Sequence, residues 1–132
     1  MTIADTDVLI DYLSGVNPSA DRIAAELAHG SLATTAITRF ELLCGARNPR
    51  QKELIRELLA LIPTLLLDEA AADRAAEIKR SLERSGTAIG MADTLIAGIV
   101  LVHSGVLLTR NRRHFERVAG LRIAAVSAQQ DT

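Results

Sequence analysis

Short apolar segments alternate with longer helical segments along the whole chain, and this alternation restricts the possible folds more than any other feature. The short segments are expected to form strands at residues 2–5, 31–34, 64–67, 105–109 and 121–126. When strands alternate with helices, the strands are usually parallel and the helices cover both faces of the sheet. The sequence therefore predicts an α/β protein, a three-layer α/β/α sandwich with a mainly parallel central sheet.

Helix boundaries follow from capping residues and from glycines and prolines. Thr6 or Asp7 is expected to cap the first helix, Thr35 the third, and Asp68 or Glu69 the fifth. The expected helices span residues 8–14, 17–29, 35–45, 49–62, 68–84 and 91–102, with a short helix inside the loop 110–118.

Length and composition indicate one ordinary domain. A chain of 132 residues can bury about two-thirds of the surface that it exposes when unfolded, so residues 1–132 are expected to form a single domain. A hydrophobic content of 48% and a net charge of -1 are typical of a globular protein and name no partner. Cys44 is the only cysteine, so no internal disulfide can form. Its apolar neighbours predict a buried, inert thiol.

The sequence contains no pattern that predicts export or membrane insertion. Asp5, Asp7 and Asp11 interrupt the apolar stretch that a signal peptide requires. The longest apolar stretch, residues 91–108, includes Asp93 and is expected to be a buried helix followed by a strand, with no membrane span. Together with the lone cysteine, these features predict a cytoplasmic protein.

Three acidic residues, Asp5, Glu41 and Asp93, interrupt segments that otherwise read as buried. An isolated carboxylate in a core costs several kcal/mol unless it is paired or binds a metal. Asp5 ends the first strand, and Thr109 and Asn111 end or follow the fourth, so these residues can share the crevice at the carboxyl ends of parallel strands. The pattern predicts a metal site, and a metal in a small acidic crevice indicates phosphodiester chemistry.

Each acid also has an ordinary structural interpretation. Asp5 can cap the first helix, but Thr6 or Asp7 can supply the same cap. Asp93 can cap a helix that is apolar nearly all round. Taken together, the acids favour a shared site because they come from different elements.

Glu41 is the least conclusive of the three acids. It lies on a helix flank beside an expected apolar stripe formed by Phe40 and Leu43, where a solvated face would carry more polar residues. This neighbourhood predicts that Glu41 is partly enclosed and belongs to the same site as Asp5 and Asp93.

Four ordered blocks of sequence, at residues 4–13, 35–46, 92–98 and 108–118, carry a family resemblance. The chain resembles the PIN-domain ribonucleases of the VapC type, which are toxins of type II toxin-antitoxin systems. The resemblance implies an endoribonuclease. It also implies metal-binding roles for Asp5, Glu41 and Asp93, and places Thr109 and Asn111 in the family's fourth element.

Asn111 departs from the family pattern, since many members have another aspartate in this element. An amide oxygen can ligate a hard cation but adds no charge. We therefore expect one tightly bound Mg²⁺, with Mn²⁺ as a substitute, and a weaker second ion. The family's reaction is hydrolysis that leaves a 5′-phosphate and a 3′-hydroxyl. Asp7 is expected to cap a helix or to lie at the surface more than to support the site.

A basic stretch follows the fourth strand. Between Gly105 and Arg122, five arginines accompany a single acid, so this stretch carries a net charge of +4. Arg110, Arg112 and Arg113 are expected to bind RNA phosphates beside the site. His114 is expected at the rim and has no nucleophilic partner that would indicate a triad. With only three aromatic residues, a base-stacking platform is not expected.

The family resemblance also implies an antitoxin partner, whose tail inserts an arginine or blocks the crevice. Apolar positions on the helices at residues 54–61 and 70–78 suggest a homodimer, although core packing explains the same pattern.

Other functions remain open at this point. A phospho-receiver needs a lysine at a late strand end, and Lys52 and Lys79 are not placed there. A catalytically weak or inactive PIN-like interaction module is the stronger alternative, because Asn111 is compatible with a degraded site. DNA cleavage is a third possibility, and the sequence does not identify an RNA target.

Overall fold

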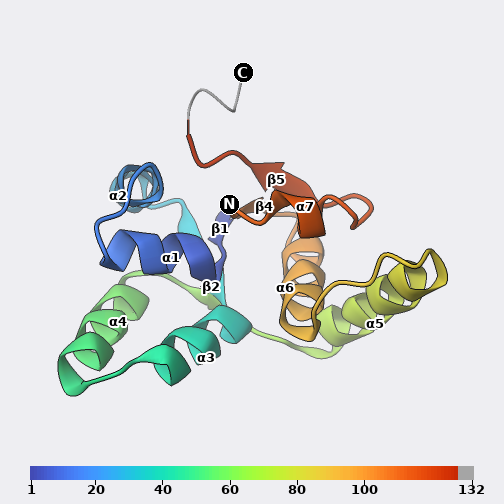
Figure 1. The fold of residues 1–132 in the computed structure, drawn as a ribbon, viewed down its shortest axis with the longest axis horizontal. Coiled ribbons are helices and arrows are strands. Elements are labelled where there is room, and N and C mark those ends of the chain that lie inside the picture. Colours follow the sequence, from blue (N-terminus) through green and yellow to red (C-terminus); the bar gives the residue numbers. More distant parts are fainter. Residues whose placement is uncertain (128–132) are drawn as a thin grey trace.

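The structure is a computed structural model that describes residues 1–127 (Figure 1). The strands are β1 (Thr2–Ala4), β2 (Leu32–Thr35), β3 (Thr64–Leu65), β4 (Val106–Leu108) and β5 (Arg122–Ala124). The helices are α1 (Thr6–Leu13), α2 (Ser19–His29), α3 (Ala36–Gly45), α4 (Pro49–Leu61), α5 (Glu69–Arg84), α6 (Met91–Val102) and α7 (Arg112–Phe115).

The five strands form one parallel sheet in the order β3-β2-β1-β4-β5. Strand β1 lies at the centre, where Ile3 is in register with Ala33 of β2 and with Leu107 of β4. The carboxyl ends of β1 and β4 therefore lie side by side. The predicted α/β fold with a parallel central sheet is confirmed.

Two hydrophobic clusters lie on opposite faces of the sheet. Because side chains alternate along a strand, Ile3 packs with residues of α5, α6 and α7, whereas Ala4 packs with residues of α1 to α4. Figure 1 shows the same division, with the first four helices on one side of the sheet and α5 and α6 on the other. This arrangement gives the three layers that the sequence predicts.

The start of α1 and the end of β3 differ from the predicted boundaries. Helix α1 begins at Thr6, and its N-cap is Asp5, whose carboxylate accepts the N–H of Thr6; the prediction of Thr6 or Asp7 as the cap is wrong. Strand β3 is shorter than predicted, and Leu66 and Leu67 after it are exposed. The predicted caps Thr35 and Asp68 are confirmed, since each accepts an N–H of the following turn.

Two side chains of helix α3 are more exposed than predicted. Phe40 is 65% exposed and Cys44 is exposed, so the predictions of an apolar stripe at Phe40 and of a buried thiol are wrong. The helix instead buries Thr38 and Leu42. These two positions are four residues apart and share one face, which turns the helix so that Glu41, half-buried beside them, lies near α1.

Helix α6 packs closely against α5. A Cβ added to Gly98 would lie 2.8 Å from the carbonyl oxygen of Ala71 and 2.9 Å from Cβ of Ala75, so only glycine permits this approach. Residues 91–108 form this buried helix followed by strand β4, as predicted. Within residues 1–127, no helix is long and apolar enough to cross a membrane.

Candidate active site

Asp5 and Thr109 meet at the carboxyl ends of the two neighbouring strands β1 and β4. The N–H of Asp5 donates to the carbonyl of Leu108 at 3.0 Å, which continues the pairing of the strands by one residue. The Thr109 hydroxyl then donates to Oδ2 of Asp5 at 2.7 Å. The structure therefore brings together these two predicted site residues.

Asp5 is buried, with 5% of its surface exposed. Burial raises its pKa, hydrogen bonds from Thr109 and from the N–H of Thr6 oppose this effect, and the charges of Asp7 and Asp93 raise the pKa further, to about 7. Burial and neighbouring acids together disfavour the ionised form. A bound cation would favour it, so this carboxyl group has the electrostatic character of a metal ligand.

Glu41 reaches the site through Thr6. The Thr6 hydroxyl donates to Oε1 of Glu41 at 2.6 Å and lies 3.1 Å from the hydroxyl of Thr38, while the N–H of Thr6 donates to Asp5. Thr6 therefore links the two carboxylates without bringing them into direct contact.

Asn111 and His114 surround the Asp93 carboxylate in the first turn of α6. Nδ2 of Asn111 lies 3.3 Å from Oδ2 of Asp93 and 2.9 Å from Nδ1 of His114, which is itself 3.4 Å from the same Asp93 oxygen. An Asn111 amide that donates to both groups requires an unprotonated Nδ1 on His114. The sequence prediction of His114 as a rim residue missed this contact, although its i+3 spacing from Asn111 on a helical turn was a signal.

The donor set fits a hard cation by chemistry. Carboxylate oxygens of Asp5, Glu41 and Asp93, with the Asn111 amide oxygen available after an amide rotation, are the ligands that Mg²⁺ and Mn²⁺ prefer. In this structure Asp5 accepts hydrogen bonds from Thr6 and Thr109, Glu41 accepts one from Thr6, and Asp93 accepts one from Asn111. Residues 1–127 contain no preformed group of three or more acidic, histidine or cysteine side chains that could hold a metal ion. The three acids would therefore have to turn toward a shared ion.

A family model described as "PIN domain" matches residues 2–121. The chain belongs to the PIN-domain family.

Two relatives show where this PIN domain lies within the family. It is 32% identical over 122 residues to the tRNA(fMet)-specific endonuclease VapC of Shigella flexneri, with 89% of this chain and 92% of the relative covered. It is 36% identical over 115 residues to ribonuclease VapC10 of Mycobacterium tuberculosis, with 87% and 86% covered. The resemblance to VapC-type PIN proteins is confirmed.

The fold comparison agrees with the sequence comparison. The DNA-bound VapBC structure from Salmonella typhimurium contains a chain that superposes on this PIN domain with a TM-score of 0.84 at 26% identity, covering 96% of this chain and 98% of that one. The five-stranded sheet and its flanking helices are thus those of a VapC-type PIN domain.

Arg110 of this PIN domain is engaged with an acidic partner. Its Nε lies 2.7 Å from Oδ2 of Asp11 and its Nη2 lies 3.4 Å from Oδ1, so the guanidinium predicted to bind RNA is used in an ion pair. Arg112 pairs with Glu116 at 3.4 Å. Arg113 is exposed, and its side chain contacts no hydrogen-bond partner among residues 1–127. RNA binding by the three arginines stays a prediction.

Asp7 lies beside Asp5 and is more enclosed than predicted. Its Oδ2 accepts the N–H of Arg110 at 3.0 Å, whereas its Oδ1 is buried without a hydrogen-bond partner among residues 1–127. Burial is the main cause that raises the pKa of Asp7. The expectation of a capping role for Asp7 is wrong because Asp5 is the N-cap, and Asp7 is half-buried at the edge of the site.

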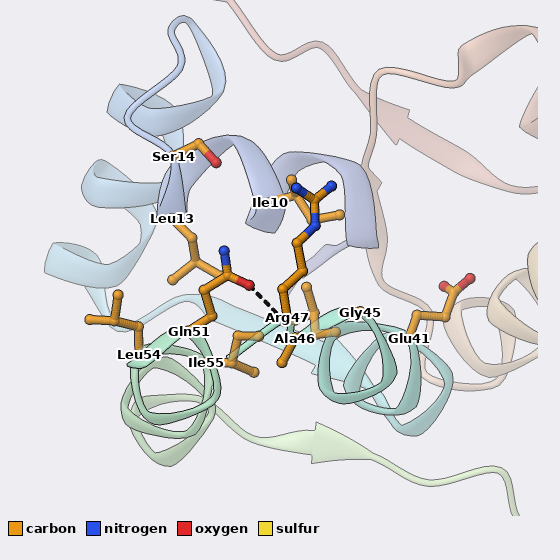
Figure 2. A pocket seen from close by; sticks show the side chains of 11 residues that line it. Ile10, Leu13, Ser14, Glu41, Gly45, Ala46, Arg47, Gln51, Leu54 and Ile55 are labelled. Carbon is orange, nitrogen blue, oxygen red and sulfur yellow. Dashed lines mark hydrogen bonds between the residues drawn. The ribbon is translucent and has the colours of Figure 1, made fainter. Parts of the chain in front are cut away.

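A pocket of about 370 Å³ lies between α1, α3 and α4 (Figure 2). Its walls are mainly apolar, and among the predicted site residues it touches only Glu41. Arg47 crosses it, held at its backbone N–H by Oε1 of Gln51 at 2.7 Å. The pocket is therefore a neighbour of the acidic site and not its centre.

Proposed function

We propose that this PIN domain is an endoribonuclease that hydrolyses RNA phosphodiester bonds with a bound Mg²⁺, for which Mn²⁺ can substitute. The observation that carries the proposal is the buried Asp5, with a pKa raised to about 7, placed beside Thr109 and near Asp93 at the carboxyl ends of β1 and β4. The names of the VapC relatives, which are those of ribonucleases and endonucleases, support the reaction class.

The chain's own residues prepare the site. Asp5 is oriented by two hydrogen bonds, from the N–H of Thr6 and the hydroxyl of Thr109. Asp93 is oriented by the Asn111 amide, which also contacts Nδ1 of His114. A divalent cation, when bound, polarises the phosphoryl oxygen and lowers the pKa of its bound water. We infer that the carboxylates would hold the cation at the carboxyl ends of β1 and β4, and that the burial of Asp5 excludes bulk water from this position.

The decisive experiment is incubation of the purified protein with total RNA and either Mg²⁺ or Mn²⁺, with and without EDTA, followed by mapping of the cut ends. Discrete cuts with 5′-phosphate and 3′-hydroxyl ends that disappear with EDTA are expected. Asp5→Asn is the matched control because it keeps the size of the side chain and removes its charge. Cleavage that survives both EDTA and Asp5→Asn would rule out the proposal.

An inactive interaction module is the second candidate, because Asn111 provides no fourth charge. Titration with Mn²⁺ separates the enzyme from the inactive module. The enzyme binds the ion and cuts RNA, whereas the inactive module does neither. Single-stranded and duplex DNA belong in the same assay, since the arrangement of acids does not itself distinguish ribose from deoxyribose.

We also propose an antitoxin protein as partner. The pocket of Figure 2 supports this, because the apolar Ile10, Leu13 and Leu54 line it while Glu41 connects it to the site. A peptide segment in this pocket would lie next to the acids. Several neighbouring structures are VapBC assemblies, including the one from Salmonella typhimurium.

A homodimer stays a prediction, and its reason, apolar surface on α4 and α5, holds only in part. The apolar residues of α4 and α5 lie mostly in the core, as at Leu58 and Ile78. The exception is Leu61 at the end of α4, which is 71% exposed, and further exposed apolar side chains lie outside these two helices, at Phe40, Leu66 and Met91. A light-scattering mass of one chain at micromolar concentration would contradict a dimer. A cytoplasmic location likewise stays a prediction.

A further inference from the structure

Arg110 lies between two site residues, Thr109 and Asn111, and its side chain is held by helix α1. The guanidinium makes a two-point contact with Asp11, and the N–H of Arg110 donates to Asp7. Asp7 and Asp11 are four residues apart and therefore lie on one face of α1. Both the main chain and the side chain of Arg110 are thus held by the same face of the helix.

The acid that receives Arg110 is itself fixed. Asp11 is buried, and its Oδ2 also accepts the hydroxyl of Ser19 at 2.7 Å, where Ser19 is fully buried at the start of α2. A planar guanidinium on a carboxylate restrains orientation as well as distance. The Arg110–Asp11 ion pair therefore connects the segment after β4 to both α1 and α2.

The residues on either side of Arg110 make the contacts that shape the site. Thr109 donates to Asp5 at 2.7 Å and accepts the N–H of Asn111 at 3.0 Å. The Asn111 amide reaches Asp93 at 3.3 Å. Movement of Arg110 would displace both neighbours because they are joined to it by single peptide bonds.

We propose that Arg110 is a positioning residue, whose ion pair with Asp11 holds Thr109 and Asn111 against Asp5 and Asp93. This inference rests on the proposed ribonuclease function. It gives Arg110 a different role from the RNA contact that the sequence predicts: Arg110 acts through its two neighbours and does not bind the phosphates.

The test compares Arg110→Ala, Arg110→Lys, Asp11→Ala and the double alanine variant in RNA cleavage and in RNA binding in EDTA. Each alanine variant should lower kcat by about 10- to 100-fold, because small displacements of site groups have effects of that size, and RNA affinity should not change. The double variant should lose no more than the worse single variant. Arg110→Lys should be more active than Arg110→Ala, since lysine keeps the positive charge but cannot make the two-point contact of a guanidinium with Asp11.

Two controls make the comparison specific. Arg56→Ala removes an exposed arginine of α4 that contacts no side-chain partner among residues 1–127, and it should leave both kcat and affinity unchanged. Asp11→Asn keeps the shape of Asp11 and an oxygen for Ser19, and replaces Asp11→Ala if that variant folds poorly.

Amide hydrogen exchange in metal-free protein gives a readout that does not depend on activity. The amides of Arg110 and Asn111 should exchange faster in both alanine variants and not in Arg56→Ala. Weaker RNA binding by Arg110→Ala, with normal cleavage by Asp11→Ala, would overturn the proposal in favour of a phosphate contact. A parent protein that cuts no RNA would contradict the proposed function alone, because the exchange measurement would still decide whether the ion pair positions the segment.

Discussion

The hydroxyl of Thr109 donates a hydrogen bond to Oδ2 of Asp5 at 2.7 Å, across the ends of two neighbouring parallel strands. Thr109 is fully buried, so no water competes for this bond. The bond favours the ionised form of Asp5 and opposes the burial that raises its pKa. Thr109 thus lowers the pH at which Asp5 becomes charged, against the larger effect of burial.

Thr109→Val should move the low-pH limb of RNA cleavage to higher pH. The substitution keeps the size of the side chain but removes the donor to Asp5, along with the acceptor of the Asn111 N–H, so the pKa of Asp5 rises and protons compete more strongly with the cation for this carboxylate. Thr109→Ser is the matched control because it keeps a hydroxyl. Profiles of kcat against pH for the three proteins provide the measurement, and an unchanged limb in Thr109→Val would show that Asp5 does not govern it.

Asp5→Asn should change how the stability of the metal-free protein depends on pH. The pKa of Asp5 is about 7 in the folded protein, whereas the ordinary value of an aspartate, which applies to the unfolded chain, is 3.8. As pH rises from 4 to 7, the unfolded chain therefore loses its proton while the folded chain keeps it. The unfolding free energy of the parent should fall over this window, by on the order of 4 kcal/mol at most. Below pH 4 this contribution is fully retained.

The asparagine variant lacks this titration, so its stability relative to the parent should increase as pH rises from 4 to 7. Urea unfolding in EDTA at several pH values measures the difference. A difference that is constant with pH would mean that Asp5 is already ionised in the folded protein. RNA cleavage by Asp5→Asn should fall by orders of magnitude even where its stability improves.

The contact between Asp5 and Thr109 can be predicted from the sequence because it depends only on the order of the strands in the sheet. Asp5 and Thr109 end adjacent parallel strands, so their meeting requires only the correct strand order. The contacts of Arg110 and His114 depend instead on the backbone path of a short loop and one turn of helix. Local sequence patterns do not determine side-chain directions at that level, which is why a rim of RNA-binding arginines was the simpler prediction.

The misplaced face of α3 has a similar cause. Apolar periodicity favours burial of Phe40 and Leu43. Leu43 does pack, partly buried, against the core, but Phe40 is exposed and the folded chain buries Thr38 next to Thr6. The packing of Leu42 in the core and the contact of Thr38 with Thr6 are both consistent with this orientation of the helix. The rotation leaves Phe40 and Cys44 exposed and brings Glu41 within 2.6 Å of the Thr6 hydroxyl.

Asp93→Asn and Asn111→Asp should have opposite effects on metal binding. Asp93→Asn removes a negative ligand, so cleavage should fall by orders of magnitude while folding is retained. Asn111→Asp places a carboxylate where an amide now lies 3.3 Å from Asp93, so the metal-free protein should be less stable through repulsion. The added charge should also tighten metal binding.

Thermal melting with and without Mn²⁺ checks both variants. The increase in Tm caused by Mn²⁺ should be larger than the parent's in Asn111→Asp and smaller in Asp93→Asn. An unchanged metal response in Asn111→Asp would mean that position 111 does not face the ion. Parent-like cleavage by Asp93→Asn would contradict the assignment of a metal-dependent nuclease.

Gly98→Ala should destabilise the protein by about 1–3 kcal/mol, the usual range for an added methyl in a close-packed interior. The new Cβ would lie 2.8 Å from the carbonyl oxygen of Ala71 and 3.0 Å from the amide nitrogen of Ala75, and these backbone atoms cannot move without separating α5 from α6. Since α6 carries Asp93 in its first turn, cleavage should also decrease. Gly45→Ala is the matched control, because an added Cβ there meets no atom within 4 Å. Urea unfolding of both variants measures the effect, and equal stability of Gly98→Ala and Gly45→Ala would mean that α5 and α6 lie further apart in solution than in this structure.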